Sequence, residues 1–397
     1  AVLRVEEPEL LGRLSREAMA RIGEFELCDL LNLAWGLAAA AACSEVCLAA
    51  LQVVQREVAA RVHEHGPPSI QSTPAVICTR FADMILGVVW ASSFAGCLTV
   101  DLLTAARRAL VTFGTELDSG TDSTTARATR VSPLSDWASR MKTDVVALSP
   151  PGSEFGCGHH HDSQDTPQVV LSLADRLVIS KPPGWEVFNR NLALEEQQLV
   201  TFLQAQMPQL RQPLLYDSTH QFGFLHRLDV PSSGLILVAG TYEAWYDLRL
   251  QLHAGMLSRD YTVLCHGWVP PERVAVSAPV RWRGQGSTIA GWQGKPSLTR
   301  LKVAAHGLHK GHTLSLLAVR IATGRRHQIR SHAGHIGHPT VCDGKYTGVA
   351  TFSSDRRFCW RNFLHRHRLA LRDAAGRPRE ALAPLPGDLA AALGRLA

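Results

Sequence analysis

Residues 222–240, FGFLHRLDVPSSGLILVAG, decide the fold of the second half of the chain. The run GLILVA at 234–239 is apolar throughout and has the length of a strand, which predicts a buried strand. The Pro-Ser-Ser-Gly turn before it places the polar side chains of His226, Arg227 and Asp229 together at the edge of the predicted sheet. Taken alone, Asp229 is best explained as a turn-forming residue, because Asp is favoured in turns.

Short apolar runs separated by turns continue on both sides of this segment. They predict an α+β domain whose sheet is mixed and largely antiparallel. We expect strands at 169–173, 177–180, 234–239, 261–265, 298–304 and 313–321, and helices at 242–252 and from about 323–324.

The N-terminal part has a different pattern. Apolar residues recur at helical spacing in 9–65 and again in 81–114, so we expect an all-α segment over 1–114. Trp35 and Trp90 occupy comparable places in the two blocks, which is compatible with a two-copy repeat or with an ordinary helical bundle. The LLNLAWGLA helix resembles helices of organellar RNA-binding repeat proteins of the octotricopeptide-repeat and FAST-kinase-like families, which implies that this segment helps to hold RNA.

Residues 115–166 are rich in Ser, Thr, Asp, Gly and Pro and lack apolar periodicity, so we expect a flexible linker before a catalytic domain at 167–397. Cys157 and the histidines at 159–161 offer zinc-type ligands. A single cysteine lacks the paired spacing of a structural zinc site, and we therefore predict no metal.

Composition limits the class of protein. A length of 397 residues, 46% hydrophobic and 19% charged residues predict a soluble chain of two or three domains. The net charge of +6 suits a polyanionic partner, although many proteins without one are as basic. Nine cysteines without a Cys-x-x-Cys pair favour a reducing intracellular compartment, either the cytoplasm or an organelle. We find no apolar run of about 18 residues and expect no membrane span.

A second motif, TGRRHQIRSHAGHIGHP at 323–339, concentrates cationic residues near a predicted helix N-terminus. Such a cluster attracts phosphate oxygens, although a solvated basic helix face is a common alternative. The chain lacks a Gly-x-Ser-x-Gly elbow, a Walker loop and a Gly-x-Gly-x-x-Gly turn. Acyl transfer, NTP hydrolysis and hydride transfer therefore lack their usual sequence support.

Five segments in order resemble the RluA-type branch of the RsuA/RluA pseudouridine synthases. They are ISKPPGWEVF, HRLDVPSSGLIL, SRDYTVLCHGWV, TGRRHQIRSHAGHIGHPTVCDGKY, and FLHRHRLAL followed by ALAPLPGDL. The resemblance implies an isomerase that flips a uridine out of structured RNA, breaks its C1′–N1 bond and rejoins the base through C5. It also implies rRNA or tRNA as partner and no cofactor, including no nucleotide cofactor. We further expect a monomer that does not bind a membrane.

The same resemblance assigns site residues. Asp229 matches the family's essential aspartate, Arg330 the arginine that pairs with it, and Tyr261 the tyrosine that stacks on the flipped uracil. Arg227 matches the arginine that fills the space left by the flipped base. The remaining residues predicted to contact RNA or support the loop are His226, Arg325, Arg326 and His327.

The chain departs from the family pattern at several positions. Cys342 stands where the family usually has Gly before Asp343, and a positive φ there would strain the turn. Ser232 replaces Thr, Arg259 replaces Lys, and an S4 RNA-binding domain is not recognisable. An impaired synthase that only binds RNA is therefore a second hypothesis. A glycosidase-like hydrolase is a third, disfavoured because no second carboxylate accompanies Asp229 in the motifs.

Overall fold

The computed structural model describes residues 8–40, 45–68, 75–120, 166–189, 197–207, 209–210, 212–282, 284, 286–291 and 294–397. The chain divides into two compact units. The helical unit comprises residues 1–128, 241–257 and 374–376, and the sheet unit comprises the remaining residues. Residues 121–165, which include Cys157 and the three histidines of the predicted linker, lie outside the described residues.

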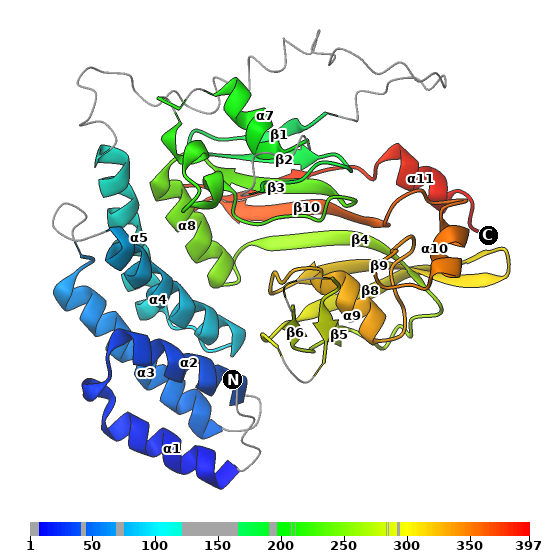
Figure 1. Cartoon of the computed structure of the whole chain (residues 1–397). Coiled ribbons are helices and arrows are strands. Elements are labelled where there is room, and N and C mark those ends of the chain that lie inside the picture. The colour runs from blue at the N-terminus through cyan, green and yellow to red at the C-terminus, as the bar shows by residue number, and fades with distance from the viewer. Residues whose placement is uncertain are drawn as a thin grey trace. The chain divides into compact units, whose positions relative to one another are not determined.

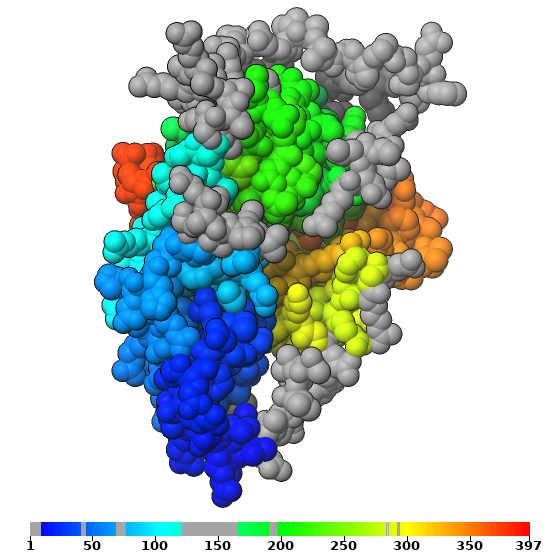
Figure 2. All heavy atoms as spheres, turned by 60° about the vertical axis from the view of Figure 1, so that its left-hand side comes forward, coloured from blue at the N-terminus to red at the C-terminus, as the bar shows by residue number. Residues whose placement is uncertain are grey.

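The helical unit confirms the all-α prediction for the N-terminal part (Figure 1). Trp35 and Trp90 stack on each other with ring centroids 4.1 Å apart, so the two predicted blocks pack through their tryptophans. The first helix lies at the surface of this unit (dark blue, Figure 2). Its elements are α1 (Pro8–Ala20), η1 (Ile22–Glu24), α2 (Leu27–Ala40), α3 (Glu45–His65), α4 (Ala75–Phe94), α5 (Val100–Gly120) and α8 (Tyr242–His253).

Helix α8 belongs to the helical unit, although its sequence lies within the predicted domain 167–397. The carboxylate of Asp118 on α5 accepts the backbone N–H groups of Tyr242 and Glu243 at 2.9 and 3.0 Å, which satisfies free donors at the N-terminus of α8. The two helices approach closely at Gly114, where a Cβ would lie 2.4 Å from the Cα of Glu243. Residues 115–120 are therefore helical rather than part of the linker, because they continue α5 along α8.

One helix corrects the statement that no apolar run reaches about 18 residues. Residues 77–94 of α4 are by length and composition apolar enough to cross a membrane, with a mean hydropathy of 1.3. Within the chain, 44% of this window is buried, and α4 packs against α2, α5 and α8. A core helix passes the same test, because a helix that is apolar on most sides can be buried by its neighbours.

The sheet unit contains, among its described residues, a nine-stranded sheet in the order β1-β2-β3-β10-β4-β9-β8-β5, with β11 paired to β10 (Figure 1). Its neighbours are antiparallel except β3 and β10, which run parallel, so the predicted fold class is confirmed. The strands are β1 (Gln168–Ser172), β2 (Arg176–Lys181), β3 (Ser233–Ala239), β4 (Ser258–His266), β5 (Ala275–Val276), β8 (Thr299–His309), β9 (His312–Ile321), β10 (Leu364–Arg372) and β11 (Pro378–Leu382), and a separate hairpin joins β6 (Val280–Arg281) to β7 (Ile289–Ala290).

The helices of the sheet unit are short. They are α7 (Leu199–Gln206), η3 (Pro213–Tyr216), η4 (Gln221–Gly223), α9 (Gln328–His335), α10 (Val349–Asp355) and α11 (Gly387–Leu393). The prediction that a helix begins near 323–324 was wrong, because α9 starts at Gln328. The preceding residue, His327, has a left-handed φ of 50°, and the side chain of Gln328 accepts the backbone N–H of Arg325, so this stretch forms a turn.

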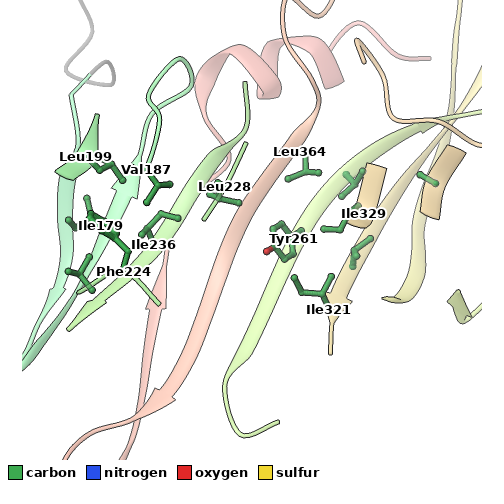
Figure 3. Close-up of a cluster of buried hydrophobic side chains, with 14 of the residues drawn as sticks. Ile179, Val187, Leu199, Phe224, Leu228, Ile236, Tyr261, Ile321, Ile329 and Leu364 are labelled. Atoms are coloured by element: carbon green, nitrogen blue, oxygen red, sulfur yellow. The ribbon is translucent and has the colours of Figure 1, made fainter. Parts of the chain in front are cut away.

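An apolar cluster fills one face of the sheet and includes the residues that precede Asp229 and Arg330 (Figure 3). Strand β3 is buried at every position, as its continuous apolar run predicts. Leu228, directly before Asp229, and Ile329, directly before Arg330, both belong to this cluster. Burial of these two apolar neighbours fixes where the two charged side chains leave the core.

Candidate active site

Asp229 lies in the turn that leads into β3. The N–H of Ser232 donates to the carbonyl of Asp229 at 3.0 Å, which closes the predicted turn. The N–H of Gly184 donates to the carbonyl of Val230 at 2.8 Å and joins this turn to the loop after β2. The Asp229 side chain is 25% exposed, so the carboxylate is held at the rim of the core and remains open to solvent.

Arg330 connects two carboxylates. Its Nη1 donates to Oδ2 of Asp229 at 2.7 Å. Its Nε and Nη2 donate to the two oxygens of Asp343 at 2.7 and 2.6 Å, a bidentate pair. Burial disfavours the charge, but Asp343 and Asp229 more than offset it and raise the pKa of Arg330. The guanidinium is thus held rigidly by Asp343, and its hydrogen bond orients the Asp229 carboxylate.

His327 lies beside this pair as a neutral side chain. Its Nε2 is 3.7 Å from Oδ1 of Asp229, and its Nδ1 is 3.2 Å from the hydroxyl of Tyr346. Burial lowers the pKa of His327 to about 4, although the charge of Asp229 opposes the shift. Near neutral pH, Arg330 is therefore the cation that Asp229 contacts, and His327 supports the turn.

Tyr261 lies on β4 within the apolar cluster, with its hydroxyl directed toward β10 (Figure 3). It is 2% exposed, and its hydroxyl accepts hydrogen bonds from Arg366 rather than from Arg330. The resemblance to the pseudouridine synthases predicted that Tyr261 lies together with Asp229 and Arg330. Within the described residues, the structure brings Asp229 and Arg330 into contact and joins Tyr261 to His226 through Arg366.

The remaining predicted residues fall into two groups. Arg227 is exposed and forms an ion pair with Glu186 at 3.2 Å, and Arg326 is exposed and lies 4.5 Å from the centre of the Trp282 ring. The guanidinium groups of Arg227 and Arg326 are therefore accessible to a ligand in solution. Arg325 instead donates to the carbonyl of Pro296, and burial lowers its pKa.

Lys181 supports the turn that carries Asp229, and it was not predicted as a site residue. It is fully buried, and its Nζ donates to the carbonyls of Pro182, Trp185 and Val230 at 2.9, 2.8 and 3.2 Å. Three carbonyls match the three hydrogens of an ammonium group. Burial and the nearby Arg361 lower the pKa of Lys181 to about 7.

Comparison with known proteins identifies the family. Residues 175–335 match the family described as RNA pseudouridylate synthase. The mouse protein named RNA pseudouridylate synthase domain-containing protein 1 is 31% identical over 239 residues, which cover 56% of this chain and 74% of the mouse protein. The chain belongs to the RNA pseudouridylate synthase family.

Other relatives extend the comparison. The human protein of the same name is 33% identical over 215 residues, covering 50% of this chain and 64% of the human protein, so the chain spans slightly less than two thirds of that relative. Ribosomal large subunit pseudouridine synthase D of Nitrosomonas europaea is 34% identical over 188 residues, covering 47% of this chain and 52% of that protein.

The family departure at Cys342 is structurally accommodated. Cys342 has a φ of 57°, the left-handed region in which a residue other than Gly is strained. Its thiol is 3% exposed within an apolar cluster, and its N–H donates to Asp355 at 2.7 Å. The next residue, Asp343, still accepts both hydrogen bonds from Arg330. Burial of the thiol and the hydrogen bond thus offset the backbone strain.

We expect Cys342→Gly to change the free energy of unfolding by less than about 1 kcal/mol, because relief of the left-handed strain offsets the lost thiol burial. Cys342→Val should cost more than about 2 kcal/mol, because a β-branched residue fits this φ poorly. Urea unfolding of both variants checks the order. A Gly variant much more active than the wild-type chain would instead support the hypothesis that Cys342 impairs the site.

Among the described residues, no group of three or more His, Cys, Asp or Glu side chains is arranged to hold a metal ion.

Proposed function

We propose that this chain is an RNA pseudouridine synthase that isomerises specific uridines to pseudouridine in structured RNA, with Asp229 as the catalytic carboxylate. The observation that carries the proposal is the charged pair of Asp229 and Arg330 at 2.7 Å, with Arg330 fixed by Asp343. The pair provides a carboxylate that is 25% exposed and held in one direction. Such a group can act at the sugar or the base of a uridine without a redox centre or metal.

The family supports RNA as the substrate, and relatives named as ribosomal large subunit synthases favour rRNA. We propose that the chain acts as a monomer and needs no nucleotide cofactor. We propose that the N-terminal helical segment assists RNA binding and that residues 167–397 form the catalytic domain. Helix α8 belongs to residues 167–397 in sequence but packs with the helical segment. Arg227 is proposed to enter the space left by the flipped base, since its guanidinium is 55% exposed and planar.

The test is pseudouridine mapping of RNA from cells with and without the protein. We expect one or a few modified positions to disappear in the deletion and to return when the wild-type chain is expressed. An unchanged map across rRNA, tRNA and other RNAs would favour the alternative of a binding protein built on the same domain.

Trp282 is proposed as an RNA contact beside the site. It is 46% exposed and stacks under Arg326, and its hairpin is joined to the site because the N–H of Thr288 donates to the hydroxyl of Tyr346 at 2.8 Å. An exposed indole can stack on a base, and such stacking contributes about 1–3 kcal/mol.

We therefore expect Trp282→Ala to weaken binding of the target RNA at least about fivefold, which corresponds to about 1 kcal/mol. Filter binding or fluorescence anisotropy measures the change in Kd. Trp268→Ala is the control, because Trp268 is 56% exposed but stacks on His306 of β8. Equal losses in the two variants would contradict a specific contact at Trp282.

A further inference from the structure

Arg366 on β10 is a buried cation that contacts three parts of the site. Its exposed fraction is 1%. Its Nε and Nη2 donate to the hydroxyl oxygen of Tyr261 at 2.9 and 2.5 Å. Its Nη1 donates to Nδ1 of His226 at 2.7 Å and to the carbonyl of Leu235 at 2.8 Å. Arg366 thus joins β4, the segment before Asp229 and β3 in one network.

The backbone places Arg366 there because position 234 is a glycine. Gly234 has a φ of 117°, and a Cβ at this position would lie 2.3 Å from the carbonyl oxygen of Arg366. The start of β3 and β10 are therefore in direct contact, and the guanidinium position is fixed by the main chain as well as by its hydrogen bonds.

The chemistry of the guanidinium fixes the direction of the Tyr261 hydroxyl. A guanidinium has five N–H donors and no acceptor. The hydroxyl hydrogen of Tyr261 therefore cannot lie between the two groups and must point away from Arg366. In the described part of the chain, the hydroxyl forms hydrogen bonds with Arg366 alone, so its hydrogen is available to another acceptor.

The charge of Arg366 also makes this hydroxyl a stronger donor. Among the described residues, Arg366 forms no ion pair, whereas Arg368 on the same strand pairs with Asp260 and Glu380. His226 adds no second positive charge, because burial and Arg366 lower its pKa well below the usual value and leave it neutral. A hydroxyl that accepts two charge-assisted hydrogen bonds is polarised and donates more strongly.

We propose that Arg366 is a positioning residue that fixes Tyr261 as a hydrogen-bond donor to the uracil, an inference that rests on the proposed function. When the C1′–N1 bond breaks, its electron pair leaves with the base, and negative charge spreads over N1 and the carbonyl oxygens of uracil. A fixed donor aimed at one of these oxygens stabilises that charge and cannot be replaced by a stacking ring alone. Because Tyr261 is 2% exposed, the proposal requires the uracil to displace the side chains that cover it.

Kinetics of four variants test the proposal. Tyr261→Phe keeps the ring and removes the donor, and we expect kcat to fall about 100-fold with little change in KM. Arg366→Gln should lower kcat to a similar extent, and Arg366→Lys should restore part of it because a buried cation is retained. The double variant Tyr261→Phe with Arg366→Gln should be no slower than Tyr261→Phe, since both changes remove one function.

The matched control is Tyr216→Phe. The hydroxyl of Tyr216 donates to the carbonyls of Gln204 and Met207, away from the charged pair, so its loss should leave kcat unchanged. Full kcat in Tyr261→Phe would overturn the proposal. Multiplicative losses in the double variant would also overturn it, because they would show that Arg366 acts independently of Tyr261.

A measurement without RNA separates this inference from the proposed function. In chain labelled at the Cζ carbon of tyrosine, the resonance that disappears in Tyr261→Phe should have the chemical shift of a phenol that bears its hydrogen. The chemical shift of this Tyr261 resonance should change in Arg366→Gln. The shift of a phenolate would overturn the inference even if the chain forms pseudouridine. A phenol shift in a chain that forms no pseudouridine would leave the hydroxyl assignment intact and count against the proposed function.

Discussion

Asp229→Asn should reduce pseudouridine formation at least about 10³-fold, equivalent to about 4 kcal/mol of transition-state stabilisation. The amide keeps the size of the side chain but loses the charge that Arg330 orients at 2.7 Å. Total RNA labelled with tritium at C5 of uridine, prepared from cells lacking the protein, is the substrate. Because C5 exchanges its hydrogen for C1′ in the product, tritium release measures turnover directly.

The control for this prediction is stability. Asp229 is partly exposed and its turn is closed by main-chain hydrogen bonds, so the variant should unfold within about 1 kcal/mol of the wild-type chain. Tritium release by Asp229→Asn close to that of the wild-type chain would refute Asp229 as the catalytic carboxylate. Loss of activity with retained stability and RNA binding would support it.

Arg330→Met should lower the free energy of unfolding by about 3 kcal/mol or more and also abolish measurable turnover. Stability falls because the fully buried Asp343 would lose both hydrogen bonds from the guanidinium and become an unpaired buried charge. The loss of turnover arises because Asp229 would no longer be oriented. Urea unfolding followed by circular dichroism and the tritium assay measure the two effects separately.

Two further variants sharpen this test. Arg377→Met breaks a pair in which the arginine is 68% exposed, and it should cost less than about 1 kcal/mol. Adding Asp343→Leu to Arg330→Met removes the unpaired charge and should recover part of the stability but none of the activity. A double variant that regains turnover would show that Arg330 does not position Asp229.

Much of the fold could be predicted because local patterns specify it. The all-apolar run of β3 required burial on both faces, and the helical periodicity before residue 114 required helices. The start of α9 could not be predicted, because the left-handed His327 and the side-chain bond of Gln328 depend on contacts in the folded chain. The packing of α8 with α5 was missed for the same reason, since Asp118 and Gly114 lie 124 and 129 positions before their partners Tyr242 and Glu243.

For the candidate site, the sequence by itself determined the motifs, and their resemblance to the pseudouridine synthase family predicted that Asp229 pairs with Arg330. Motif matching supplies residue identities in order along the chain, and it needs no knowledge of the fold. Only the tertiary structure decided that the buried Asp343 holds Arg330, that Lys181 supports the turn of Asp229, and that Arg366 rather than Asp229 contacts Tyr261. These contacts join residues on different strands and loops, and the hydrogen-bonding directions of a buried cation are fixed only when those strands are packed.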